Sequence, residues 1–169
     1  MSHIIIDTSI LIAIRNNNGK KIINTILEKY DDHTPWISYM TRFEYLRTCQ
    51  SIKQIHEHIK EIEKFNPLSV DDDLIKWATG YYSVLSKHKR KDGAKAISAR
   101  QLSDSDTIIG ASAMLTGSKL ITLDRNDFPA PFFTEIEEAM KLSPKSNQKV
   151  FVLQADTPFY DQEYAKLMT

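Results

Sequence analysis

A chain of 169 residues falls within the usual length of one domain with one sizeable core, and 41% hydrophobic and 26% charged residues exclude a disordered or fibrous protein. Lys plus Arg and Asp plus Glu both number 22, so the net charge gives no global indication of a nucleic-acid partner. The apolar stretches near the start are too short to span a bilayer, and an aspartate interrupts them where a secretory signal would stay apolar. We therefore expect a cytoplasmic protein without a membrane segment.

Short apolar runs alternate with stretches of helical periodicity along most of the chain. Strands are expected at His3 to Asp7, Pro35 to Ser38, Asn66 to Val70, Lys119 to Leu123 and Val150 to Leu153. Helices are expected from Ser9 onward, at Lys20 to Tyr30, from a cap at Ser38 or Thr41 through Cys49, at Ile52 to Phe65, at Asp71 to Ser86, and from a cap at Ser103 or Asp104 to Gly117. Strands that alternate with helices predict an α/β fold with a central parallel sheet.

Two segments stand outside this alternation. A basic connection with one glycine runs from Lys87 to Arg100, and a linker-like stretch runs from Leu142 to Lys149. We expect residues 1–142 to form the main domain. Residues 143–169 form a C-terminal extension with an extra strand, which either belongs to the same domain or ends in a tail or partner-binding arm.

Four carboxylates fall where the predicted topology would bring them together. Asp7 and Asp124 directly follow two strands, and ligands of open parallel sheets bind beyond the carboxyl ends of the strands. Glu44 follows the second strand by one or two helical turns, and Asp106 lies in the first turn of its helix. We expect these four side chains to line one end of the sheet.

Such a cluster makes physical sense chiefly as a site for hard divalent cations, because crowded carboxylates repel one another and their pKa values would otherwise rise. Mg²⁺ or Mn²⁺ prefers carboxylate and water oxygens, and the sequence offers no set of His and Cys that would indicate zinc. Phosphodiester hydrolysis is the reaction that follows, since metal ions activate water and neutralise the charge that develops on phosphate.

The same residues carry a resemblance to a known family. The stretches IIIDTSILI around Asp7, ISYMTRFEYL around Glu44, DSDTIIGASAMLTG around Asp106 and KLITLDRNDF around Asp124 resemble, in this order, the PIN-domain signature. The resemblance covers roughly the first 130 residues and is greatest to the toxin ribonucleases of bacterial and archaeal VapBC toxin–antitoxin pairs. It implies a three-layer α/β/α fold, a Mg²⁺ or Mn²⁺ site and endoribonuclease activity on RNA. Family habit further suggests a homodimer and an inhibitory antitoxin protein.

Two features depart from the family pattern. The chain is longer than a typical toxin of this type, both in the basic connection and beyond Ser143, so a PIN nuclease without an antitoxin is an alternative. Gly110 stands where such toxins often have alanine, on a helix face expected to pack against the sheet.

Further residues are candidates for support or for substrate binding. Thr8, Asp104, Thr122 and Asp127 could steady the metal ligands, although Asp104 could equally cap a helix and Asp127 could be a turn residue. Substrate RNA could contact Arg42, Lys89, Arg90 and Arg125, although basic loops are usually just solvated. The aromatic residues, including Tyr81, lie at spacings typical of a core.

Each carboxylate also has a purely structural interpretation, as the end of a strand, the start of a helix or part of a turn. Two other functions are therefore considered. A catalytically silent PIN-fold module would bind RNA or protein without cutting. A phosphatase or phospho-acceptor domain would use Asp7 as a nucleophile, but it would usually need a second aspartate close behind, where Thr8, Ser9 and Ile10 stand.

Overall fold

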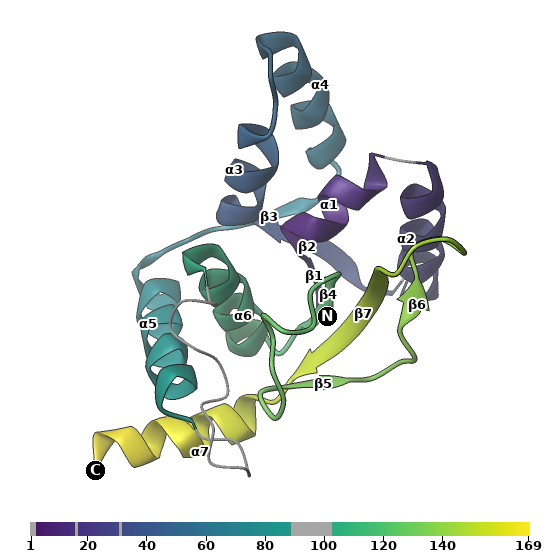
Figure 1. Cartoon of the computed structure of the whole chain (residues 1–169). Coiled ribbons are helices and arrows are strands. Elements are labelled where there is room, and N and C mark those ends of the chain that lie inside the picture. The colour runs from purple at the N-terminus through teal and green to yellow at the C-terminus, as the bar shows by residue number, and fades with distance from the viewer. Residues whose placement is uncertain (1–2, 16, 31, 89–102) are drawn as a thin grey trace.

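The computed structural model describes residues 3–15, 17–30, 32–88 and 103–169, and their helices flank a seven-stranded sheet (Figure 1). The strands are β1 (His3–Ile6), β2 (Thr34–Ser38), β3 (Asn66–Leu68), β4 (Lys119–Thr122), β5 (Phe133–Glu135), β6 (Met140–Lys141) and β7 (Lys149–Ala155). The helices are α1 (Thr8–Ile14), α2 (Asn17–Lys29), α3 (Tyr39–Arg47), α4 (Ile52–Ile62), α5 (Asp72–Lys87), α6 (Asp104–Thr116) and α7 (Thr157–Met168). The predicted α/β class is confirmed.

The sheet has the strand order β3-β2-β1-β4-β7-β5, with β6 paired to β7 off this path. Strands β3, β2, β1 and β4 are parallel, as the alternation of strands and helices predicts. Strands β7, β5 and β6 pair in antiparallel fashion, so the predicted central parallel sheet is extended on this side by antiparallel strands. The reason is that no helix separates β4 from the strands that follow it, and short connections reverse the chain direction.

Alternate side chains of each central strand enter two different cores. Ile5 and Leu120 pack with α5 and α6 on one face of the sheet, where Tyr81 is among the largest buried side chains. Ile4, Ile6 and Ile121 pack with α1 and α2 on the opposite face. Side chains of a strand point alternately to opposite faces, so a strand that is buried on both faces is apolar at every position. The run Ile4 to Ile6 has this pattern.

The C-terminal segment belongs to the folded body. Strand β7 lies between β4 and β5, and α7 packs against α5 (Figure 1). Leu153, Ala155 and Tyr160 are buried in the core on the α5 side. From this packing we infer that residues 143–169 are part of the same domain as residues 1–142.

Other differences from the predicted elements are local. Helix α2 begins at Asn17, inside the stretch expected to separate two helices, and α4 ends at Ile62, before Phe65. Strands β5 and β6 were not predicted, because at three and two residues they are too short for a periodic pattern. In the described ranges, no helix is long and apolar enough to cross a membrane.

Candidate acidic site

Asp7 lies at the carboxyl end of β1 and also caps α1. Its Oδ1 accepts the backbone N–H of Thr8 at 2.6 Å, and its Oδ2 accepts the hydroxyls of Ser9 at 2.5 Å and Thr122 at 2.7 Å. The Asp7 N–H donates to the carbonyl of Ile121 at 3.0 Å, which ties the ends of β1 and β4 together. Asp7 is only 5% exposed, so this carboxylate is a fixed part of the strand-to-helix turn.

Glu44 lies in the second turn of α3, whose N-cap is Ser38. The Ser38 hydroxyl accepts the Thr41 N–H at 3.0 Å, which decides between the two caps that the sequence allowed. Thr8 donates to Glu44 Oε2 at 2.7 Å, and Ser105 donates to Glu44 Oε1 at 2.6 Å. Hydroxyls from α1 and α6 therefore hold the Glu44 carboxylate from both sides.

Asp106 lies in the first turn of α6, where Ser103 is the N-cap. The Ser103 hydroxyl accepts the Asp106 N–H at 3.1 Å and donates to Asp106 Oδ2 at 2.5 Å. Asp104 is exposed in the same turn and is not the cap. The first turn of α6 thus contributes Asp106 and, through Ser105, support for Glu44.

The loop after β4 contributes two more carboxylates. The Thr122 hydroxyl accepts the Asp124 N–H at 3.0 Å while it donates to Asp7, so one buried side chain connects both acidic motifs. Asp124 Oδ1 accepts the Asn126 N–H at 3.0 Å and shapes the turn that leads to Asp127. Asp127 is half-buried beside the others rather than a remote turn residue.

The electrostatics show that these carboxylates share one environment. Burial raises the pKa of Asp7, and the charge of Glu44 adds to this against the lowering effect of its hydrogen bonds. Burial and the charges of Asp7 and Glu44 raise the pKa of Asp106. Burial, followed by the charges of Asp106, Asp124 and Asp7, raises the pKa of Asp127 to about 7. The site therefore gathers negative charge in a poorly solvated place.

The donor set fits a hard divalent cation, because it consists of carboxylate and hydroxyl oxygens whose mutual repulsion a cation would relieve. Within the described residues, however, no three Asp, Glu, His or Cys side chains approach closely enough to hold an ion as they stand. The hydroxyl groups of Thr8, Ser9 and Ser105 satisfy the carboxylates locally. A bound cation would have to draw the carboxylates inward from these positions.

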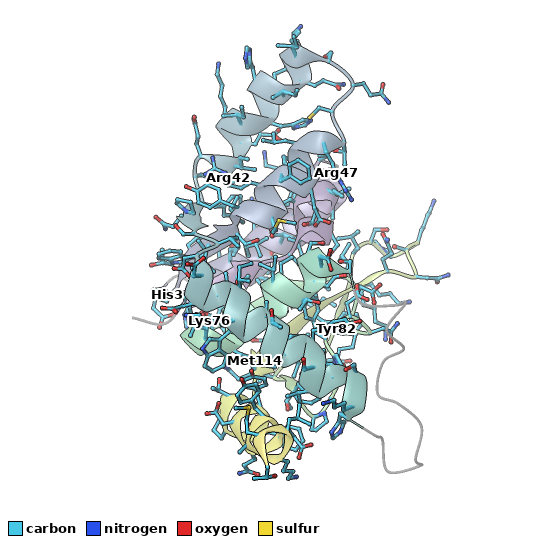
Figure 2. The ribbon with its side chains drawn as sticks, turned by 90° about the vertical axis from the view of Figure 1, so that its left-hand side faces the viewer. His3, Arg42, Arg47, Lys76, Tyr82 and Met114 are labelled. Carbon is cyan, nitrogen blue, oxygen red and sulfur yellow. The ribbon has the colours of Figure 1, made fainter. Side chains whose placement is uncertain are left out.

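The basic residues expected to bind substrate have different surroundings. The Arg125 guanidinium contacts the carbonyl oxygens of Phe128 and Phe133 and the carboxylate of Glu135, the last at 3.1 Å, so its donors are engaged in the loop. Arg42 lies on α3, near the Tyr39 ring (Figure 2). Lys89 and Arg90 lie outside the described residues.

Two hydroxyl residues at the site, Ser9 and Ser105, could not be assigned from the sequence. Ser9 donates to Asp7 and accepts the Leu123 N–H at 3.1 Å, and Ser105 supports Glu44. Arg47 reaches Glu44 Oε1 at 3.7 Å and balances part of its charge (Figure 2). Ser9 and Ser105 stand next to or between the acidic residues, but the sequence shows no signal that separates them from ordinary capping residues.

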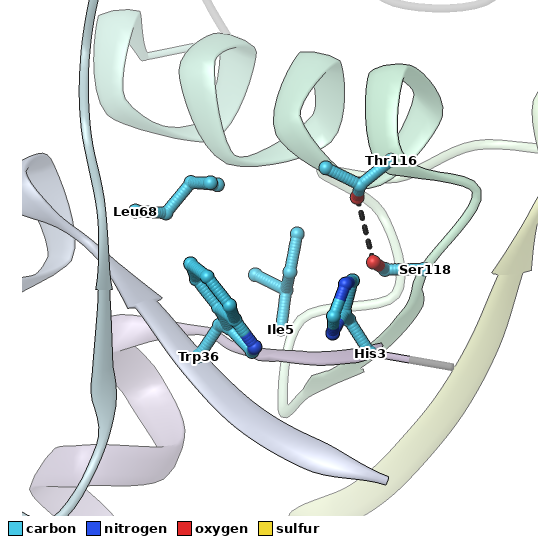
Figure 3. Close-up of a pocket in the computed structure, with 6 residues that line it drawn as sticks. All are labelled: His3, Ile5, Trp36, Leu68, Thr116 and Ser118. Atoms are coloured by element: carbon cyan, nitrogen blue, oxygen red, sulfur yellow. Dashed lines mark hydrogen bonds between the residues drawn. The ribbon is translucent and has the colours of Figure 1, made fainter. Parts of the chain in front are cut away.

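A small cavity of about 60 Å³ lies on the α6 side, toward the amino ends of β1 and β4. His3, Trp36 and Leu68 line it together with the hydrogen-bonded pair Thr116 and Ser118, whose hydroxyl oxygens are 2.6 Å apart (Figure 3). Among the described residues, those that line the cavity include no carboxylate, and its walls are mostly apolar.

Comparison with known protein families finds a match over most of the chain. The PIN domain model matches residues 4–131, about three quarters of the chain, including all four motifs. The chain belongs to the PIN domain family. No curated protein sequence matches this PIN domain protein.

Among solved structures, this PIN domain is similar to a toxin–antitoxin complex from Klebsiella pneumoniae. The similarity has a TM-score of 0.55 and 20% sequence identity, and it covers 75% of this chain and 91% of that chain. At this identity the similarity concerns the fold. The PIN match ends at residue 131, so β7 and α7 lie beyond the part that the family model describes.

Proposed function

We propose that this protein is a Mg²⁺- or Mn²⁺-dependent endoribonuclease in which Asp7, Glu44, Asp106 and Asp124 hold the cation and form the catalytic site. The observation that carries the proposal is the electrostatic coupling of carboxylates from four separate motifs. Asp7, Asp106 and Asp127 have raised pKa values to which neighbouring carboxylates of the other motifs contribute. Native structures tolerate such crowding chiefly where it serves a function.

The carboxylates of the site would bind the cation, and neighbouring hydroxyl groups would orient these carboxylates. Thr8 and Ser105 fix the Glu44 carboxylate, while Ser9 and Thr122 fix Asp7, so the ligands are held by side chains from rigid elements. A divalent cation, when bound, supplies Lewis-acid activation of water and neutralises charge on the phosphoryl oxygens. A phosphodiester would lie beyond the carboxyl ends of the strands, where open parallel sheets bind their ligands.

The geometry argues against a phosphatase that uses Asp7 as nucleophile. Asp7 is 5% exposed, and hydrogen bonds from Thr8, Ser9 and Thr122 occupy both of its oxygens. A carboxylate held in this way is poorly placed for in-line attack on a phosphate. Formation of an aspartyl-phosphate from small phosphate esters would nevertheless reverse this conclusion.

We propose RNA as the substrate and a toxin role because this chain is similar to toxins in its motifs and its fold. The four motifs resemble those of VapBC toxins, and the structural neighbour is described as a toxin–antitoxin complex. We propose an inhibitory antitoxin partner and a homodimer on the same grounds. Growth arrest on expression, relieved when the product of an adjacent small open reading frame is co-expressed, would support the toxin role. Expression without effect on growth would favour a PIN nuclease that acts without an antitoxin.

The deciding experiment is cleavage of a labelled total-RNA pool by the purified chain, with EDTA, Mg²⁺ or Mn²⁺, beside Asp7→Asn. We expect products that require the metal and that disappear in the variant. Asp7→Asn should fold, because it removes a charge whose burial is unfavourable. If a folded wild-type chain binds RNA but yields no products with either metal, the silent binding module is the better assignment.

A further inference from the structure

Tyr81 carries a buried hydroxyl that takes no part in the hydrogen bonds of the acidic site described above. It lies on α5, its side chain is fully buried, and its hydroxyl has no hydrogen-bond partner in the described part of the chain. The ring is fixed by edge-on contacts with Phe132, Phe133 and Tyr160. Leaving a buried hydroxyl unpaired costs free energy that a phenylalanine at the same place would not cost.

Gly110 makes the position of this ring possible. A β-carbon at residue 110 would lie 2.7 Å from Tyr81 Cε1 and 3.4 Å from the Tyr81 hydroxyl oxygen. The first distance is shorter than any real contact, so even alanine would force the ring to move. The phenol end of Tyr81 therefore packs against α6 at Gly110. This is the position at which similar toxins often have alanine.

This contact directs the hydroxyl to the side of α6 that carries Asp106. Residues 106 and 110 are four apart on one helix and therefore share a face, one turn from each other. Burial raises the pKa of the Tyr81 hydroxyl, and the charges of Asp106 and Asp127 add to this effect while the charge of Arg125 opposes it. The unpaired donor thus lies buried against α6, on the helix face that also carries Asp106 one turn away.

We propose that Tyr81 is a positioning residue of the acidic site, whose hydroxyl donates a hydrogen bond to the Asp106 carboxylate, directly or through one ordered water, when the carboxylates close on a divalent cation. The inference rests on the proposed function, because it assigns Tyr81 a role in that same site. Ser103 already donates to Asp106 Oδ2, so a second donor would fix the orientation of the carboxylate. Residues that orient metal ligands in this way commonly contribute strongly to metal affinity.

The test compares wild type with Tyr81→Phe, which keeps the ring and removes only the hydroxyl. Mn²⁺ binding is measured by calorimetry without RNA, and thermal unfolding is measured without metal. We expect the variant to bind Mn²⁺ about 10- to 100-fold more weakly, with metal-free stability equal to or above that of wild type. Tyr82→Phe is the matched control, since Tyr82 is the next residue on α5 and is 38% exposed (Figure 2); its Mn²⁺ affinity should equal that of wild type.

Two outcomes overturn the inference in distinguishable ways. Equal Mn²⁺ affinity of Tyr81→Phe and wild type would show that the hydroxyl is only an unpaired core group, and the proposed function would stand. If wild type itself binds no Mn²⁺, the proposed function fails and the role of Tyr81 fails with it. Gly110→Ala provides a second route, because displacing the Tyr81 ring should weaken Mn²⁺ binding while every hydroxyl stays in the chain.

Discussion

The Thr8 hydroxyl, next to Asp7 in the first acidic motif, donates to Glu44 Oε2 in the second motif at 2.7 Å. Ser105, from the third motif, donates to the other oxygen of the same carboxylate at 2.6 Å. Three separate segments of the chain therefore meet at Glu44. In the part of the chain that the structure describes, hydroxyl groups hold this carboxylate, and Arg47 is the cation that reaches it, at 3.7 Å.

We predict that Thr8→Val and Ser105→Ala each lower RNA cleavage by about 10- to 100-fold, because partners that orient ligands have effects of this size. Thr8→Ser retains the hydroxyl and should retain most of the activity. The measurement is the initial rate on one RNA substrate at saturating Mn²⁺. Full activity of both hydroxyl-less variants would mean that Glu44 does not need its two donors.

A second prediction concerns the metal-free stability of the protein as pH changes. The pKa of Asp127 is raised from 3.8 to about 7, so the folded chain keeps a proton that the unfolded chain releases at lower pH. This contribution to stability is complete below a pH of about 4 and is lost as pH rises to about 7. Asp7 and Asp106 are shifted in the same direction. The melting temperature without metal should therefore fall as pH rises through this window.

Asp127→Asn should reduce this fall without abolishing it, because the other two carboxylates continue to titrate. The experiment is a series of thermal melts in EDTA across the window, with Asp73→Asn as a control on the exposed side of α5. A wild-type melting temperature that rises steadily with pH over the same range would contradict the prediction.

Arg125 provides a third prediction, which separates a structural from a substrate-binding role. Its guanidinium links Glu135 and two carbonyl oxygens around the loop that carries Asp124 and Asp127. Arg125→Ala should lower the free energy of unfolding by about 1.5–3 kcal/mol, the range for hydrogen bonds to charged groups. Urea unfolding measures this effect. Unchanged stability together with weaker RNA binding would instead favour the substrate-binding role predicted from the sequence.

The basic connection supports a fourth prediction, made from its sequence alone. If Lys89 and Arg90 contact RNA phosphates, replacing both with alanine should reduce the slope of log affinity against log salt by about one for each lost contact. Binding is measured with the Asp7→Asn chain, which prevents cleavage. Lys76→Ala is a control that removes a cation from the exposed face of α5 (Figure 2). Equal slopes for the Lys89/Arg90 variant and its parent would exclude phosphate contacts at these two positions.

The sequence alone predicted the α/β class, the parallel strands β1 to β4 and the convergence of the acidic motifs. These features depend on local patterns, because an apolar strand that ends in a carboxylate and leads into a helix can be recognised within about ten residues. The family match over residues 4–131 spans the same local motifs. Asp7, Glu44 and Asp106 could therefore be placed at one edge before any contact was known.

Only the tertiary structure decided which side chains support that edge. Ser105 reaches Glu44 across 61 positions, and Tyr81 reaches α6 because Gly110 leaves room for its ring, and neither relationship leaves a periodic signal in the sequence. The antiparallel β7 and the packing of α7 on α5 were hidden for the same reason. Hydrophobic periodicity reports which face of an element is buried, whereas the partner of that face depends on how the whole chain packs.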